Sequence, residues 1–291
     1  MRPGNPSAVA REYIEHGKSE TCPIVDMHGH FGPLRAGYLP SQPVEKLRRR
    51  LKRCGVKRLV CSAHDGLFGD LEGANEALQE AILQYPDTFL GYWVVNPHFH
   101  ESIANAGAAY EQSQGFVGFK LAPDYHNYPV DGERYAPVLE YANAHGLLVL
   151  SHTWGKSPYS SPQQIGEAAS RYPNAIFLMG HSGYGDWEAS LEVARACPNV
   201  YLELTAVYVS HDFSLSPSGA GQSPAGWLHV NGIIEHMVAT VSSERMLFGT
   251  DMPWYSPHYA AGAILFARIS DEARHDIMHR NAERLLARWS I

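Results

Sequence analysis

The chain has 291 residues, a hydrophobic content of 45% and a formal charge of −7 at pH 7. This length and composition are sufficient for one large α/β barrel or for two smaller domains with a sizeable core. Acidic residues outnumber basic ones, 30 to 23, and no basic stripe with interleaved aromatic residues appears, which argues against a nucleic-acid partner. The one basic run, at 46–53, is typical of a helix with one buried stripe and a solvated basic face.

The cysteines and the N-terminal sequence bear on the cellular compartment. Cys22, Cys54, Cys61 and Cys197 form no C-x-x-C pair and are too few to cross-link a chain of this length. Residues 1–17 lack the apolar core of a signal peptide, and no apolar run approaches membrane-spanning length. We therefore expect reduced thiols, a cytoplasmic protein and no membrane partner.

Eight short apolar runs follow one another along the chain, and each precedes a helix-like stretch or a loop and a helix. They lie at 23–28, 58–63, 89–95, 115–121, 147–152, 175–181, 200–205 and 246–251. Strands that alternate with helices indicate right-handed βαβ units and a parallel sheet buried on both faces. Eight such units in roughly 250 residues are what a (β/α)8 barrel requires.

An open doubly wound sheet is the rival architecture. It would usually carry a Gly-rich dinucleotide turn after its first strand, and "VDMHGHFG" at 25–32 contains none. We therefore predict an α/β protein, a single-domain TIM barrel over 1–291, with an N-terminal extension at 1–21. A long loop rich in Ser, Gly and Pro is predicted at 206–228, between the seventh and eighth strands; such loops serve as lids, binding loops or contacts in a homo-oligomer.

Polar side chains stand at the ends of five predicted strands, and the carboxyl ends of barrel strands meet at one mouth. These residues are His28, His30, Lys120, His152, His181 and Asp251. Any single histidine could be a hydrogen-bonded core residue, and Asp251 could cap a helix, but their shared position favours a site. Nitrogen and oxygen donors without thiolate suit a catalytic Zn²⁺ or a similar divalent ion.

This ordered set of motifs resembles the amidohydrolase superfamily, and most closely its branch of aminocarboxymuconate-semialdehyde decarboxylase, resorcylate decarboxylases and lactone hydrolases. The resemblance runs from residue 22 to residue 288 and includes the H-x-H pair, "FGTDMPW" at 248–254 and "NAERLLA" at 281–287. It implies a barrel with a metal site. The resemblance implies that the metal ligands are His28, His30, His152 and Asp251. It also implies that His181 is the acid–base group beside them.

Lys120, in "GFKLAP" at 118–123, has two interpretations. In binuclear members of the superfamily that it resembles, a lysine on the fourth strand is carbamylated and bridges two metal ions. Alternatively, the charged end of Lys120 binds a substrate carboxylate or pairs with an acid. We favour the second interpretation, and with it one ion per chain, Zn²⁺ or else Mn²⁺.

Other residues in the loops after the strands could line a substrate pocket, although packing is the ordinary role of each aromatic one. These candidates are Arg35, His64, Tyr125, His126, Trp154, Trp254 and Tyr255.

The residues predict metal-dependent hydrolysis of a small-molecule substrate with a carbonyl group, a lactone, cyclic amide or ester. A bound divalent ion lowers the pKa of its water from ~15.7 to about 7 and so supplies hydroxide for attack. Asp251 would take the proton, and His181 would orient or protonate the oxygen that develops charge. A hypothesis of another class is a non-catalytic barrel that serves as a binding protein. It predicts a gap in the set of metal ligands, and none of the expected ligand residues is missing.

The alternative reaction is non-oxidative decarboxylation of an aromatic or unsaturated carboxylic acid by the same residues. "HTWG" at 152–155 lacks the acidic residue that often follows this histidine in the decarboxylases that the chain resembles. We therefore favour hydrolysis.

Overall fold

Eight parallel strands form one sheet in the order of the sequence, from β1 to β8. The computed structural model describes residues 7–34, 40–209 and 230–289. The strands are β1 Ile24–Phe31, β2 Val56–Ala63, β3 Phe89–Val94, β4 Phe116–Leu121, β5 Leu148–Ser151, β6 Ile176–Met179, β7 Val200–Glu203 and β8 Met246–Leu247.

The sheet closes on itself between β8 and β1. The backbone N–H of Met27 donates to the carbonyl of Phe248 at 2.9 Å, and that of His30 donates to the carbonyl of Met252 at 2.7 Å. These bonds join β1 to the residues just after β8 and confirm the predicted single-domain (β/α)8 barrel.

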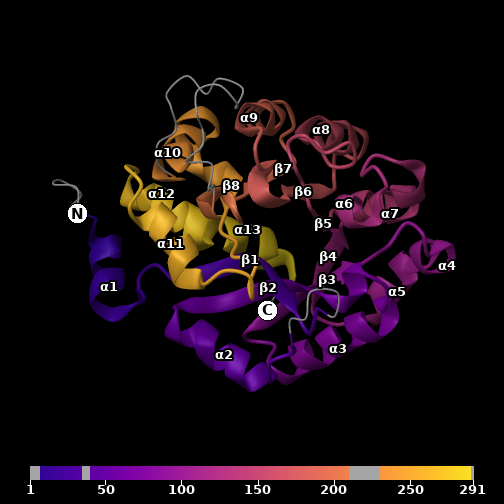
Figure 1. Cartoon of the computed structure of the whole chain (residues 1–291), viewed down its shortest axis with the longest axis horizontal. Helices are drawn as coiled ribbons and strands as arrows, with labels where there is room; N and C mark the ends of the chain where they lie inside the picture. Colours follow the sequence, from indigo (N-terminus) through magenta and orange to yellow (C-terminus); the bar gives the residue numbers. More distant parts are fainter. Residues whose placement is uncertain (1–6, 35–39, 210–229, 290–291) are drawn as a thin grey trace.

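Helices alternate with the strands and form a ring around them (Figure 1). They are α1 Ala8–His16, α2 Val44–Arg53, α3 Leu71–Gln84, α4 His100–Ala104, α5 Ala106–Gln112, α6 Pro123–His126, α7 Ala136–His145, α8 Pro162–Arg171, α9 Trp187–Ala196, α10 Val230–Val241, α11 Pro257–Leu265, α12 Asp271–His275 and α13 Asn281–Leu286.

The strands are apolar along most of their length because both of their faces are covered. One set of side chains fills the barrel interior and packs on α13, and the other packs beneath the ring of helices. Side chains of the interior set include Val25, Val60, Val117, Leu148, Leu178 and Leu247. Burial on both faces explains why the sequence shows continuous apolar runs rather than alternation.

Helix boundaries follow local capping chemistry. The hydroxyl of Ser161 accepts from the N–H of Gln164, whose own side chain accepts from the Ser161 N–H, and this capping box begins α8. Gly146 ends α7 in the left-handed conformation, with φ 60°. Gly146 stops α7 just before β5, and Ser161 starts α8 after the longer connection that follows β5.

The predicted basic helix is α2. Its Leu51 is buried and Leu47 is partly buried against the core, so one narrow stripe packs, while most of the basic side chains are exposed and Arg48 and Arg50 are half-buried. This arrangement agrees with the expected solvated basic face.

Two predicted segments lie at the limits of the description. Helix α1 lies in the segment 1–21, and residues 210–228 of the loop predicted at 206–228 lie outside the described residues. The described part of the chain contains no helix that is both long enough and apolar enough to cross a bilayer.

Candidate metal centre at the barrel mouth

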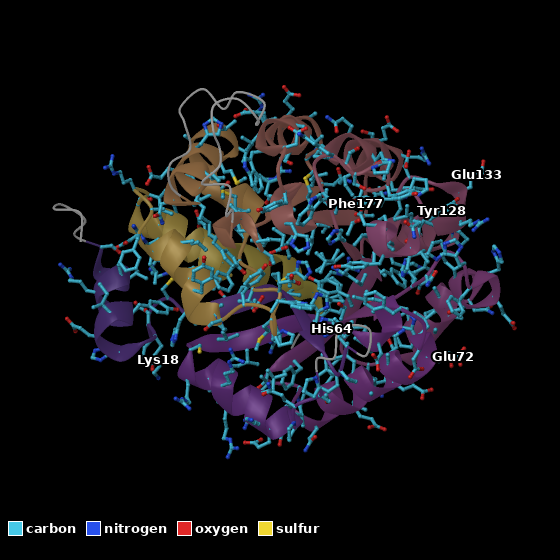
Figure 2. All side chains as sticks on the ribbon, viewed as in Figure 1. Lys18, His64, Glu72, Tyr128, Glu133 and Phe177 are labelled. Atoms are coloured by element: carbon cyan, nitrogen blue, oxygen red, sulfur yellow. The ribbon has the colours of Figure 1, made fainter. Side chains whose placement is uncertain are left out.

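A cavity of about 290 Å³ opens at the carboxyl ends of the strands, a region that we call the barrel mouth. It is lined by His28, His30, Leu34, His64, Leu67, Phe68, Lys120, Tyr125, His152, His181, Asp251 and Trp254. Figure 2 shows His64 near the middle of the barrel, whereas Glu72 and Glu133 lie at its periphery. All six strand-end residues identified from the sequence therefore reach one cavity.

His28, His30 and Asp251 form the mouth cluster, in which one ligand atom of each lies within 4.8 Å of the others. His30 Nε2 lies 2.8 Å from Asp251 Oδ1, and His28 Nε2 lies 3.6 Å from the same oxygen. Two imidazole nitrogens and a carboxylate oxygen directed at one point fit a divalent ion such as Zn²⁺.

The local structure of β1 brings the two imidazoles together. The register with β2 shifts between Asp26 and Gly29, and the carboxylate of Asp26 accepts from the N–H of His28 at 3.1 Å and from the hydroxyl of Thr250 at 2.5 Å. A Cβ on Gly29 would lie 2.6 Å from a methyl of Leu59. Glycine between the histidines therefore lets β1 approach β2 closely while Asp26 fixes the strand to the loop after β8.

Asp251 follows β8 in the left-handed backbone region, with φ 58°, and its N–H donates to the carbonyl of His28 at 2.7 Å. Burial alone would raise the pKa of its carboxyl, but His28, His181 and Lys120 outweigh burial and lower it below the ordinary value. Asp251 is therefore ionised at neutral pH, as a metal ligand or a proton acceptor must be.

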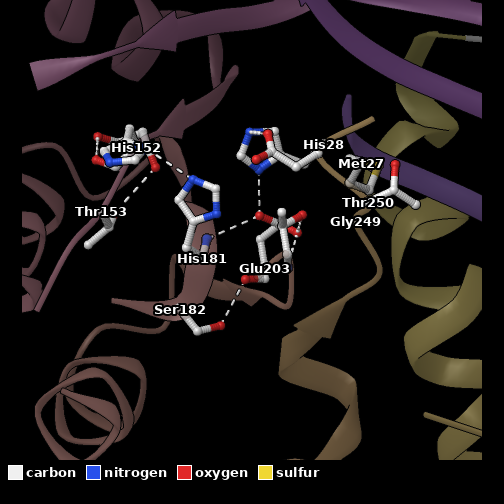
Figure 3. A network of polar contacts seen from close by, with 12 residues as sticks. Met27, His28, His152, Thr153, His181, Ser182, Glu203, Gly249 and Thr250 are labelled. Atoms are coloured by element: carbon white, nitrogen blue, oxygen red, sulfur yellow. Dashed lines mark hydrogen bonds and ion pairs between the residues drawn. The ribbon is translucent and has the colours of Figure 1, made fainter. Parts of the chain in front are cut away.

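Glu203, the last residue of β7, is the main residue of the site that the sequence analysis missed. Its Oε2 lies 2.6 Å from His28 Nδ1 (Figure 3). Its Oε1 accepts from the N–H and the hydroxyl of Thr205. Burial raises the Glu203 pKa to about 8, against the hydrogen bonds from Thr205; a divalent ion held at the mouth would favour the charged form and lower this pKa. A carboxylate that holds Nδ1–H of a histidine leaves Nε2 free to bind a metal.

His181 and His152 form a second pair on the same cavity. His181 Nε2 lies 3.0 Å from His152 Nδ1, and the backbone N–H of His181 donates to Glu203 Oε2 at 3.2 Å (Figure 3). Burial lowers the pKa of His152 to about 4 and that of His181 well below its ordinary value. Both imidazoles are therefore neutral at neutral pH.

The structure brings His152 to the mouth but not into the mouth cluster. Its Nδ1 faces His181, and its Nε2 lies 3.6 Å from Asp124 Oδ2, a residue of α6. The role of His152 as a metal ligand stays a prediction.

Lys120 is fully buried, and its Nζ lies 3.0 Å from His28 Nε2. Burial lowers the Lys120 pKa to about 8, against attraction by Asp251 and Glu203. The amine thus lies beside the mouth cluster, where it can contact either an ion or a bound substrate.

Only some of the residues predicted to contact substrate line the cavity. His64 stacks on His30 with ring centroids 4.3 Å apart, and Tyr125 and Trp254 line the cavity. Neither nitrogen of the buried His64 ring has a hydrogen-bond partner of normal geometry among the described residues. Trp154 stacks on His152 behind the lining residues, 5.5 Å between centroids, and Arg35 lies outside the described residues.

Two weaker candidates serve the scaffold. The ring of His126 contacts the hydroxyl of Tyr135 and the carbonyl of Leu67, and Tyr255 packs edge-on against Tyr208. Neither residue lines the cavity, so the structure supports packing rather than substrate contact for both.

Comparison with solved structures shows where this barrel recurs. A 5-carboxyvanillate decarboxylase from Sphingomonas paucimobilis has a TM-score of 0.67 at 14% identity, covering 91% of this chain and 99% of that one. A 2,6-dihydroxybenzoate decarboxylase from Rhizobium has the same four values. A Pseudomonas putida protein provisionally named a 2-pyrone-4,6-dicarboxylic acid hydrolase has a TM-score of 0.70 at 16% identity, covering 93% and 99%. Identities this low show a shared fold alone.

Sequence comparison identifies the family. Among curated protein sequences no significant match is found. The sequence profile of the amidohydrolase family matches residues 25–288, which include every residue of the mouth cluster. Members of this family are generally metal-dependent enzymes that act on small molecules, in agreement with the His/Asp cluster. The chain therefore belongs to the amidohydrolase family, as its strand-end motifs predicted.

Proposed function

We propose that this enzyme is a metal-dependent hydrolase of a small carbonyl compound, a lactone, cyclic amide or ester. The observation that carries the proposal is the convergence of His28, His30 and Asp251 in one cavity at the barrel mouth. We assign these residues as ligands of one ion, Zn²⁺ by preference, with His152 as the fourth. A divalent ion in that position supplies Lewis-acid activation of water and of a carbonyl group.

Asp251 is the proposed general base. Its carboxylate is ionised because nearby imidazoles and Lys120 keep its pKa low despite burial. It lies 2.8 Å from His30 Nε2, so it reaches the same point as the ligands. A carboxylate held there can accept the proton of an attacking water and pass it to the leaving oxygen or nitrogen.

His181 is the proposed group that interacts with the oxygen on which charge develops. It lines the cavity, and its Nδ1 is buried without a hydrogen-bond partner among the described residues. A neutral imidazole oriented by a second ring, here that of His152 at 3.0 Å, can donate a hydrogen bond at a fixed place.

The remaining cavity wall favours a compact, partly aromatic or carboxylated substrate. Phe68, Tyr125 and Trp254 supply an apolar wall, and the amine of Lys120 supplies one cationic contact. We propose that Lys120 binds a substrate carboxylate, since a buried amine near its titration range can carry charge when an anion pairs with it.

Decarboxylation is the second candidate. The same Lys120 contact and aromatic wall suit an aromatic carboxylic acid, and two barrels of similar fold are decarboxylases of 5-carboxyvanillate and 2,6-dihydroxybenzoate. In that reaction the ring carbon from which CO₂ departs must receive a proton; His181, which is neutral in the free site, would first take that proton from solvent and then pass it to the carbon.

One assay separates the two reactions. The zinc-loaded enzyme is incubated with panels of lactones, cyclic amides and hydroxybenzoates, and products are weighed by mass spectrometry. Gain of one water supports the proposed hydrolase, whereas loss of CO₂ with no water gained would replace it by the decarboxylase.

The Asp251→Asn variant tests the assigned base in either case. We expect turnover to be abolished while the far-ultraviolet circular dichroism spectrum is unchanged, because amide replaces carboxylate at equal volume. Asp70→Asn, on an exposed residue before α3, is the matched control. Full activity in Asp251→Asn would refute the mechanism.

A further inference from the structure

A further group of side chains that could hold a metal ion lies at the opposite end of the barrel from the mouth. Cys22 stands just before β1, His275 ends α12, and His279 lies in the π-helical turn η8, Asp276–Arg280. One ligand atom of each residue lies within 4.8 Å of the others. We call these three residues the Cys22 cluster; it shares no residue with the mouth cluster.

The two histidines present nitrogens to a common point. His275 Nδ1 lies 3.0 Å from His279 Nε2, and on the far side of the second ring His279 Nδ1 lies 2.9 Å from Glu283 Oε2. A carboxylate partner requires His279 to carry its proton on Nδ1, so the Nε2 lone pair faces the cluster. A carboxylate behind the ring is also the usual support of a metal-bound histidine.

Local structure holds all three ligands in place. The H-x-x-x-H spacing puts His275 and His279 on one face of a continuous helical segment, and π-helical turns such as η8 occur frequently at functional sites. The backbone of Cys22 is fixed from the N-terminal side, since its N–H donates to Ser19 Oγ at 2.8 Å and its carbonyl accepts from the Tyr13 hydroxyl at 3.2 Å.

Burial at this site is graded. Cys22 is fully buried, His279 is 9% exposed and His275 is partly exposed. An ion could enter beside His275 and keep solvent as a fourth ligand. Burial raises the pKa of the Cys22 thiol to about 12, so the free thiol is protonated and an ion must displace that proton to solvent.

We propose that the Cys22 cluster binds a second divalent ion, Zn²⁺ by the nature of its ligands, and thereby ties the N-terminal segment to the C-terminal helices. One thiolate sulfur and two imidazole nitrogens form a donor set that binds Zn²⁺ in preference to harder ions such as Mg²⁺. Helices α1 and α12 already contact each other, and the hydroxyl of Ser7 donates to Asp271 at 2.5 Å. The ion would add a link between the same two segments.

Cobalt spectroscopy tests the proposal apart from the mouth. Co²⁺ bound to a thiolate gives a near-ultraviolet charge-transfer band, which a site of histidine and aspartate alone does not give. The experiment uses the full chain carrying His28→Ala and His30→Ala, stripped by chelator and titrated with Co²⁺. We expect a band that saturates at one equivalent, disappears in Cys22→Ser and persists in Cys197→Ser, a matched buried thiol.

A second variant guards against misfolding of Cys22→Ser. His275→Asn changes the most exposed ligand, so it should keep the fold while weakening Co²⁺ binding at least tenfold. Zinc should also raise the melting temperature of the His28→Ala/His30→Ala protein, and this rise should vanish in His275→Asn. No thiolate band in the parent protein, or a band unchanged by both ligand variants, would overturn the proposal and leave a plain hydrogen-bonded cluster.

Discussion

At the scale of single residues, the proposed metal centre depends most on the contact between Glu203 and His28. The 2.6 Å contact of the Glu203 carboxylate with His28 Nδ1 fixes which nitrogen faces the cavity. The same carboxylate accepts from the backbone N–H of His181, so it orients one residue of β1 and one that follows β6. Loss of the Glu203 charge should therefore lower the affinity for the ion and leave the fold intact.

Glu203→Gln should weaken zinc binding at the mouth by roughly 10- to 100-fold while the fold is retained, because the amide has nearly the same volume but no charge to hold Nδ1–H. The dissociation constant is measured by competition with a chromophoric chelator. Glu192→Gln, on the exposed face of α9, is the control. Equal affinity in Glu203→Gln and wild type would show that the contact does not support a ligand.

Substitutions of His152 and of His181 should affect different quantities, metal affinity and kcat. We expect His152→Asn to lower metal affinity tenfold or more, as befits a ligand, and His181→Asn to lower kcat with the metal content unchanged. Metal content and kcat are measured on the same preparations. A His152→Asn protein that keeps its full metal content but loses kcat would instead make His152 a relay that acts through its 3.0 Å contact with His181.

The residues of the mouth were largely predictable, because each of the six stands at or near the end of an apolar run. Glu203 lies inside the apolar run "VYLELT", two residues before its end, so the rule passed over it; a charged residue inside an otherwise apolar run was the signal that could have found it. Asp26 and Ser62 were harder to predict, since they lie inside strands, where nothing in the sequence distinguishes a polar residue that supports a ligand. Ser62 Oγ lies 3.1 Å from His30 Nδ1, a contact that appears only when β1 and β2 are paired.

At the scale of elements, His126 connects two loops of the mouth. It ends α6, and its ring contacts the hydroxyl of Tyr135 and the carbonyl of Leu67, a residue that lines the cavity. Burial lowers the His126 pKa from 6.5 to about 4, against the Leu67 contact. Folding thus requires a neutral ring at pH values at which the unfolded chain binds a proton.

The sign of the pH effect follows from this lowered pKa. Below its unfolded value the unfolded state binds the extra proton, so stability falls as the pH decreases from about 6.5 to about 4. Between about pH 7 and about pH 4.5, His126 should contribute about 2–3 kcal/mol of the loss in unfolding free energy. Urea unfolding of His126→Gln should show a loss smaller by that amount.

His100→Asn serves as the control for this measurement, since His100 is exposed at the start of α4. Its loss of unfolding free energy on acidification should match that of wild type. If His126→Gln loses as much unfolding free energy on acidification as His100→Asn does, the buried ring of His126 does not contribute to the pH dependence of stability.

Element boundaries show what an apolar run can and cannot predict. All eight predicted strands occur, but β5, β6 and β8 end at Ser151, Met179 and Leu247, before the site residues that follow. His181 and Asp251 instead adopt left-handed backbone conformations with φ 61° and 58°. Such turns in residues other than glycine are set by tertiary hydrogen bonds, here to Glu203 and to the carbonyl of His28.

At the scale of the whole molecule, the closed order of strands follows from the alternation of strands and helices together with the handedness of their connections. The closure brings His28, from the first strand, against Asp251, which follows the last. The proposed base and ligands thus come from both ends of the chain, and only a closed barrel assembles them. The opposite end joins Cys22 to the C-terminal helices in the same way.

The most direct test of the metal centre is an anomalous difference map from crystals grown with zinc, recorded at the zinc absorption edge. We predict a peak enclosed by the side chains of His28, His30 and Asp251. A well-ordered mouth that shows no such peak, at a zinc concentration that supports activity, would contradict the proposed metal centre.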